Sequence, residues 1–274
     1  MIMCNDKLYE LSSPMIMGIL NITPNSFYAD SRKSNIESAI NQAKRMIDEG
    51  ADIIDVGGIS TRSGADLLSE DEELKRVLPV IQKIRKLFPD ILLSIDTFRS
   101  NVARIAVENG VNIINDVYGG WLDNKMFDTV AELNVPYILM HSRGDASNMQ
   151  DLCEYKNVVK DVIRELSVSV KILREKGVKD VIVDPGFGFA KTMEQNYELF
   201  SGLPFLEVLE CPVLVGISRK SMIYSLLKST PDYALNGTTV LNAIALMKGA
   251  KILRVHDVKE AVETRCIFEM MNKY

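Results

Sequence analysis

The sequence has few of the residues that mark disulfide-stabilised, zinc-binding or exported proteins. Its four cysteines stand far apart and form no CxxC pair, which argues against a disulfide framework and a zinc signature: Cys4, Cys153, Cys211 and Cys266. No basic segment leads into an apolar stretch at the start of the chain, so we expect no signal peptide. These absences together predict a cytoplasmic protein with reduced thiols.

Two further absences concern the partners of the protein. No apolar run approaches the roughly 20 residues that are needed to cross a bilayer, so we expect no membrane partner. The formal net charge is −5, which leaves no overall basic field to attract a polyanion, and we expect no nucleic-acid partner. Any anion that binds here must therefore be held by a local cluster of cations.

What the chain does contain is a pattern that repeats along its whole length. Short apolar runs alternate with helical stretches, and each run ends in polar residues. The runs lie at about 15–21, 51–57, 91–96, 112–117, 136–141, 180–185, 212–217 and 251–256. Because these eight runs are continuous rather than alternating, they predict parallel strands that are buried on both faces.

This alternation predicts an α/β fold, a (β/α)8 TIM barrel that forms a single domain over residues 1–274. An open doubly wound sheet is the alternative, but polar strand ends converge from the first strand to the last only if the sheet closes. Helices are predicted between the strands, for example over 34–50, 69–88 and 154–177. The strand-to-helix loops at about 22–35 and 58–70 are long for this fold and favour functional lids.

The carboxylates at the strand ends predict a ligand site at the C-terminal mouth of the barrel. Asp96 and Asp184 need hydrogen-bond donors nearby, because burying an unpaired carboxylate is costly. A planar ligand with an N–C–N edge would supply two donors, and Asn115 and Lys220 would complete the rim. A structural ion pair, such as Asp184 with Lys220, is the alternative interpretation. The convergence of the whole set favours the ligand site.

Cations also gather at these strand ends and loops, although the protein is acidic: Arg62, Lys220, Arg254 and His256. Such a cluster predicts a phosphate or carboxylate ligand. Arg219 is expected to face away from Lys220, because adjacent strand residues point to opposite sides. In DPGFGFAK, Gly186 and Gly188 permit tight turns that aim Phe187 and Phe189, one of which would stack on a flat ligand.

At these residues the chain resembles the dihydropteroate synthase family of pterin-binding barrels. The motifs MGILNITPNSF, DVGGISTRSGA, SIDT, INDV, LMH, DPGFGFAKT, GISRKS and ILRVHDVKE occur in the order that the family has. The resemblance implies transfer of the methylene of 6-hydroxymethyl-7,8-dihydropterin diphosphate to the amine of 4-aminobenzoate, with release of diphosphate. It also implies a Mg²⁺ cofactor, and we expect a homodimer.

The resemblance assigns roles to residues motif by motif. Pterin binding falls to Asp96, Asn115, Met140, Asp184 and Lys220. Diphosphate binding falls to Asn21, Arg62, Arg254 and His256, with Asn21 as the Mg²⁺ ligand. From spacing alone, Asn21 would instead be a loop-capping residue. The 4-aminobenzoate subsite comprises Thr61, Arg62, Ser63, Phe189, Lys220 and Ser221, and the catalytic set comprises Asp96, Lys220, Arg254 and His256.

Two alternative functions remain open at the level of sequence. A pterin-barrel methyltransferase that acts on methyltetrahydrofolate shares the pterin pocket, but it has no diphosphate to bind, and GISRKS and RVHDV argue against it. Departures in the two lid loops support a non-catalytic paralogue, whereas the retained Asn21, Arg254 and His256 argue against it. The first loop carries Asn25 in TPNSFYADS, and the second carries Ile59 and Ser63 where the family more often has Glu and Pro.

We predict that Ser63 weakens sulfonamide binding relative to a Ser63→Pro variant. A proline removes backbone freedom that must otherwise be lost when the loop orders, which is worth up to about 1 kcal/mol, or a roughly fivefold lower inhibition constant. Inhibition constants measured side by side test this, and equal values for the two proteins would reject it.

Overall fold

The computed structural model describes residues 1–4, 7–22, 32–59, 68–145 and 147–274. Eight parallel strands form one sheet in the order β8-β7-β6-β5-β4-β3-β10-β9. Their bounds are β3 (Met15–Asn21), β4 (Ile53–Gly57), β5 (Leu92–Asp96), β6 (Ile113–Asp116), β7 (Tyr137–Met140), β8 (Val181–Asp184), β9 (Leu214–Val215) and β10 (Ile252–Val255). Beyond the ends of this order, Val183 of β8 bridges Val213 in parallel, and its N–H donates to Pro212 O at 2.9 Å. The sheet therefore closes, which confirms the (β/α)8 barrel and excludes the open sheet.

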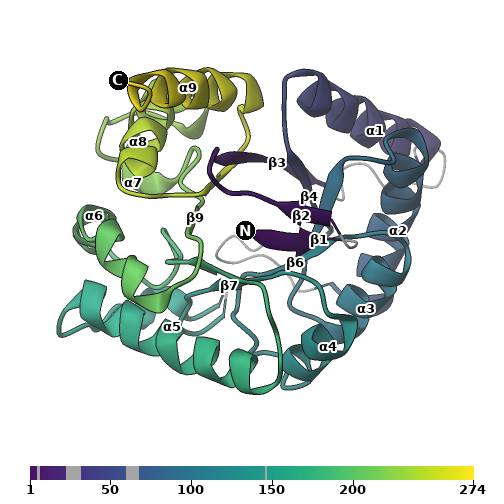
Figure 1. Cartoon of the computed structure of the whole chain (residues 1–274), viewed down its shortest axis with the longest axis horizontal. Helices are drawn as coiled ribbons and strands as arrows, with labels where there is room; N and C mark the ends of the chain where they lie inside the picture. Colours follow the sequence, from purple (N-terminus) through teal and green to yellow (C-terminus); the bar gives the residue numbers. More distant parts are fainter. Residues whose placement is uncertain (5–6, 23–31, 60–67, 146) are drawn as a thin grey trace.

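Helices surround the barrel in the view of Figure 1, along the barrel axis. They are α1 (Arg32–Asp48), α2 (Glu70–Leu87), α3 (Ser100–Glu108), α4 (Met126–Leu133), α5 (Val158–Glu175), α6 (Met193–Ser201), α7 (Ser221–Tyr224), α8 (Leu235–Met247) and α9 (Val258–Met271). Short 3₁₀ turns are η2 (Met149–Asp151), η3 (Leu203–Leu209) and η4 (Pro231–Tyr233). The helices predicted over 34–50, 69–88 and 154–177 are confirmed as α1, α2 and α5. None of the helices in the described part of the chain is long and apolar enough to cross a membrane.

Local sequence explains why α2 begins where it does. The Ser69 hydroxyl accepts a hydrogen bond from Glu72 N–H at 3.3 Å, which satisfies one of the amides that a helix start leaves unpaired. Acidic residues fill its first turn, and Arg85 and Lys86 lie in its last turn, as the helix dipole favours.

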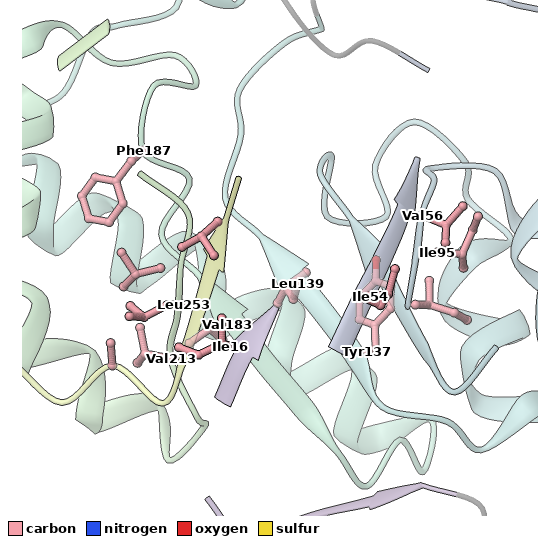
Figure 2. Close-up of a cluster of buried hydrophobic side chains, with 14 of the residues drawn as sticks. Ile16, Ile54, Val56, Ile95, Tyr137, Leu139, Val183, Phe187, Val213 and Leu253 are labelled. Atoms are coloured by element: carbon pink, nitrogen blue, oxygen red, sulfur yellow. The ribbon is translucent and has the colours of Figure 1, made fainter. Parts of the chain in front are cut away.

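Side chains alternate between the two faces of every strand, and this alternation decides what reaches the interior of the barrel. Outward residues such as Ile54, Val56 and Leu253 pack in the large buried cluster that also includes residues of the surrounding helices (Figure 2). The inward residues near the strand starts form a second apolar cluster, which includes Met17, Ile53, Leu92, Ile113, Ile138, Ile182, Leu214 and Ile252. Burying each such side chain contributes about 1.5–3 kcal/mol.

An antiparallel hairpin that the sequence pattern did not predict covers the N-terminal end of the barrel. It consists of β1 (Ile2–Cys4) and β2 (Lys7–Tyr9), and Figure 1 shows it crossing the centre of the ring. Its residues Ile2 and Cys4 join the inward apolar cluster at the strand starts. Burial, with a contribution from Asp180, raises the pKa of the Cys4 thiol to about 12. None of the four cysteines forms a disulfide bond, in agreement with the sequence prediction.

Candidate active site

One arginine joins three strands of the barrel at its C-terminal mouth. Arg254 on β10 donates from Nε to Asp55 Oδ2 on β4 and from Nη2 to Asp96 Oδ2 on β5, both at 2.7 Å. Asn115 on β6 donates from Nδ2 to the same Asp55 oxygen at 3.0 Å. The two carboxylates thus share a single guanidinium, so this cluster has one more carboxylate than cation.

That charge imbalance shifts the pKa values of Asp96 and Arg254. Burial raises the pKa of Asp96 to about 7; Arg254 opposes this shift and the neighbouring Asp55 adds to it. Burial alone would lower the pKa of Arg254, but Asp55 and Asp96 outweigh it and raise the pKa above its ordinary value. Among the described residues, Asp55 Oδ1 has no hydrogen-bond partner and is fully buried. The cluster is therefore suited to a ligand that brings N–H donors.

A second wall of the mouth comes from β8 and the end of β9. Asp184 Oδ1 accepts a hydrogen bond from Gly186 N–H at 2.7 Å, and burial raises its pKa while Lys220 opposes that shift. Lys220 donates to Phe187 O, and its Nζ lies 4.7 Å from the centre of the Phe189 ring. Burial lowers the pKa of Lys220 to about 8, against the attraction of Asp184. No ion pair within contact distance joins Asp184 to Lys220, so the structural pair considered above is not formed.

Two glycines keep these side chains close without filling the space between them. A Cβ on Gly57 would lie 3.3 Å from Asn21 Oδ1 and 3.7 Å from Asp96 Oδ2, so Asn21 borders the carboxylate cluster. A Cβ on Gly216 would lie 3.7 Å from Asp184 Oδ2 and 3.8 Å from Arg254 Cβ, so Gly216 separates the two walls. A side chain at either position would occupy the mouth.

An apolar cluster at the same end of the barrel offers a surface for a flat ligand. Met140 is buried there with Ile59, Phe98, Val117 and Tyr118, and the partly buried Phe189 packs against the cluster. Phe187 behaves differently, because its ring packs against Phe200 in the outer core with a centroid separation of 5.7 Å. Of the two phenylalanines in the glycine-rich motif, Phe189 is therefore the one available to a ligand.

The remaining predicted residues lie at the rim. His256 follows β10 directly, is exposed, and has Nδ1 3.0 Å from Ser218 Oγ. Ser221 is the exposed first residue of α7. Arg219 points away from the mouth, as predicted, and pairs with Asp257 at 2.8 Å; the reason is not strand alternation, since β9 ends at Val215 and Arg219 lies in a turn with φ +55°. Thr61, Arg62, Ser63 and Asn25 lie outside the described residues, as does most of the two long loops.

Sequence reasoning missed the role of Asp55, although it is the residue that links Arg254 to Asn115. The available signal was its spacing, since Asp55 lies two positions after the inward-facing Ile53. Asp116 is the converse case, because it ends an apolar run but faces outward. It accepts hydrogen bonds from Tyr118 N–H, Gly120 N–H and the Tyr137 hydroxyl, each at 2.8 Å, and so fixes the following turn.

The mouth of this closed barrel contains buried carboxylates, a shared guanidinium, an amide, a lysine and an apolar face. These features define a class: barrel enzymes that bind small, nitrogen-rich planar substrates. Comparison with known proteins makes this specific. The family model described as pterin-binding enzyme matches residues 17–256. The chain therefore belongs to the pterin-binding enzyme family.

Individual relatives agree on one branch of that family. Dihydropteroate synthase of Clostridium beijerinckii is 46% identical over 248 residues, which cover 89% of each chain. The crystal structure of Yersinia pestis dihydropteroate synthase with a sulfonamide drug complex superimposes with a TM-score of 0.93 and 38% identity, over 100% of this chain and 99% of that one. The structure of the Xanthomonas albilineans enzyme with 4-aminobenzoic acid gives a TM-score of 0.92 and 36% identity, over 100% of this chain and 98% of that one.

We predict a narrow, bell-shaped pH dependence of kcat/KM for the pterin substrate. Below about pH 7 Asp96 becomes protonated and loses acceptor capacity, and above about pH 8 Lys220 loses its ammonium charge. Initial rates across the range test this. The acid limb should be missing in an Asp96→Asn variant, and a profile that stays flat through both values in the unaltered protein would contradict the assignment.

Proposed function

We infer that this chain is a dihydropteroate synthase, which joins 6-hydroxymethyl-7,8-dihydropterin diphosphate to 4-aminobenzoate and releases diphosphate. The observation that carries this inference is the convergence of Asp96, Asn115, Asp184, Lys220 and Arg254 in one mouth, in a chain of this family.

The pterin is proposed to bind between the two walls. Asp184 keeps Oδ2 available beside Gly216, where it is placed to accept N–H bonds from the amidine-like edge of the ring. Lys220 is a donor for the ring carbonyl oxygen, and Asn115 and Asp96 complete the polar contacts. Met140 supplies apolar contact to the flat face.

Departure of diphosphate is proposed to precede attack by the amine, in a dissociative substitution. Ring nitrogen lone pairs stabilise the cation-like methylene carbon, and the Asp96 carboxylate favours that positive charge. The protein then has to stabilise the leaving group, for which Arg254 and His256 serve, with Arg62 from the second loop. A preorganised donor of this kind contributes roughly 2.7–4 kcal/mol. The arylamine is already a neutral nucleophile at pH 7, so no covalent catalyst is required.

Mg²⁺ is proposed as the cofactor, with Asn21 as its protein ligand. Among the described residues there is no cluster of three or more His, Cys, Asp or Glu that would hold a metal ion. A single amide oxygen beside Asp96 suits Mg²⁺, which retains several waters and binds phosphate oxygens. When bound, the ion would help to neutralise charge on the departing diphosphate.

The 4-aminobenzoate subsite is proposed to lie at the rim beside Lys220. Phe189 offers a ring face, and Ser221 offers a hydroxyl and a backbone N–H to the carboxylate. Thr61, Arg62 and Ser63 would complete the subsite from the second loop.

A cytoplasmic homodimer is proposed for the assembled protein. Exposed apolar side chains lie on the packed helices α8 and α9: Val240, Met247, Ile267, Met270 and Met271. A second copy of the same surface would cover them in a twofold arrangement. Light scattering of the purified protein would test this, and a monomer at micromolar concentration would reject it.

We predict that Asp184→Ala and Arg254→Ala affect different parts of the substrate. Loss of the Asp184 carboxylate should weaken pterin binding by at least about 100-fold, since two charged hydrogen bonds are lost. Arg254→Ala should spare a pterin without diphosphate but lose affinity for diphosphate. It should also lower the free energy of unfolding by about 3–5 kcal/mol, because Asp55 and Asp96 are left unpaired.

Calorimetric titrations with the pterin alone and with diphosphate plus Mg²⁺ separate these outcomes. If Arg254→Ala kept activity within twofold of the unaltered protein, the anion-site assignment would be wrong. A protein indifferent to diphosphate and Mg²⁺ would instead favour the methyltransferase alternative.

A further inference from the structure

Lys191 is a buried lysine that the substrate sites do not use directly. It closes the glycine-rich motif after β8 and is only 4% exposed. Its Nζ lies 2.9 Å from Gly186 O, 2.9 Å from Phe189 O and 3.1 Å from His141 Nδ1. A lysine ammonium has three N–H donors and no acceptor, so these three contacts use its full capacity.

The contacts of His141 fix which ring nitrogen carries the proton. The Glu165 carboxylate can only accept, so Nε2 carries the proton and donates to Oε2 at 3.0 Å, which leaves Nδ1 bare to accept from Lys191. The opposite tautomer would place a bare Nε2 against a carboxylate oxygen. Burial and the positive charge of Lys191 lower the pKa of His141 to about 4, so the imidazole is neutral at pH 7.

Glu165 on α5 anchors the outer end of this chain of contacts. Arg143 donates from Nε to Glu165 Oε2 at 3.1 Å and also contacts Oε1, and its guanidinium lies 3.9 Å from the centre of the Tyr155 ring. Partial burial would raise the pKa of Glu165, but hydrogen bonds from His141 and Arg143 lower it to about 2. Glu165 is therefore a permanent acceptor for His141.

The loop that Lys191 holds carries contacts to both proposed substrate subsites. Gly186 N–H donates to Asp184, Phe187 O accepts from Lys220, and the Phe189 ring faces the Lys220 ammonium. Its backbone is unusual, since Gly186 has φ +71° and a Cβ there would lie 1.9 Å from His141 O. Because its ammonium binds two carbonyl oxygens of this loop, Lys191 fixes the conformation of the turn.

We propose that Lys191 is a positioning residue for both substrates, held in its working form by the Nε2–H tautomer of His141 that Glu165 fixes. The proposal rests on the proposed substrate roles of Asp184, Lys220 and Phe189. Lys191 is placed to act through those residues, by holding the turn that carries their contacts.

The protonation of Lys191 depends on the charges and hydrogen-bond acceptors around its ammonium group. Burial lowers the pKa of Lys191 to about 7, while Asp184 opposes that shift. The other charged or titratable groups that act on it are Lys220, Arg143 and Cys153, of which the two cations favour deprotonation. Loss of the acceptor at His141 Nδ1 would therefore favour the neutral form of Lys191 further.

The first test replaces Lys191 by Met, which keeps the stem and removes the three donors, with Lys171→Met on the exposed face of α5 as the matched control. We expect Lys191→Met to raise KM for both substrates by about tenfold or more, while Lys171→Met stays within twofold. Values for Lys191→Met within twofold would overturn the proposal. A Lys220→Ala variant that kept full pterin affinity would instead reject the proposed pterin site itself.

The second test follows the tautomer and does not depend on activity. The chain has two histidines, so ¹⁵N NMR of the histidine rings resolves them, with His256→Gln used for assignment only. We expect a bare Nδ1 and a protonated Nε2 at His141 in the unaltered protein. A protonated Nδ1 there would overturn the proposal, whether or not Lys191→Met folds.

A pair of substitutions at Glu165 then connects the tautomer to function. Glu165→Gln retains an oxygen that accepts from Nε2–H, whereas Glu165→Met retains none. We expect Glu165→Gln to keep both the tautomer and KM within twofold, and Glu165→Met to lose the single tautomer and raise both KM values. Equal kinetics for the two variants would contradict the coupling.

Discussion

The pairing of Arg254 with both Asp55 and Asp96 is the interaction on which the mouth of this barrel depends. It joins β10 to β4 and β5, and through Asp55 it also reaches Asn115 on β6. One guanidinium cannot neutralise two buried carboxylates, so the cluster retains negative charge and unused acceptor capacity. A ligand that brings N–H donors or positive charge would relieve that imbalance.

The division of the barrel into two halves makes this cluster possible. Inward residues at the strand starts are apolar, and the β1–β2 hairpin covers them, so that half stabilises the fold. Two residues further along, the inward positions of β4, β5, β6, β8 and β10 are polar, and the parallel strands hold them at fixed spacing: Asp55, Ser94, Asn115, Asp184 and Arg254. The strained turn at 186–190, tied down by Lys191, extends the same rigidity to Lys220 and Phe189.

Much of this arrangement was predictable from sequence because it is local and periodic. Apolar runs that end in polar residues located the strands, and the order of motifs identified the family. Other features depend on contacts between distant residues. Arg254 and Asp55 are 199 positions apart, and the local sequence around either residue does not predict their ion pair. The hairpin was not predicted because three-residue strands carry too little sequence pattern. Asp116 shows that a polar residue at a strand end can have a structural role when its side chain faces outward.

The most direct test of the account is release of diphosphate by the purified protein, given the dihydropterin diphosphate, 4-aminobenzoate and Mg²⁺, with the product identified by mass. We expect release that depends on 4-aminobenzoate and yields dihydropteroate. Tight pterin binding without any release would contradict it and would indicate a paralogue whose mouth binds the pterin but does not complete the reaction.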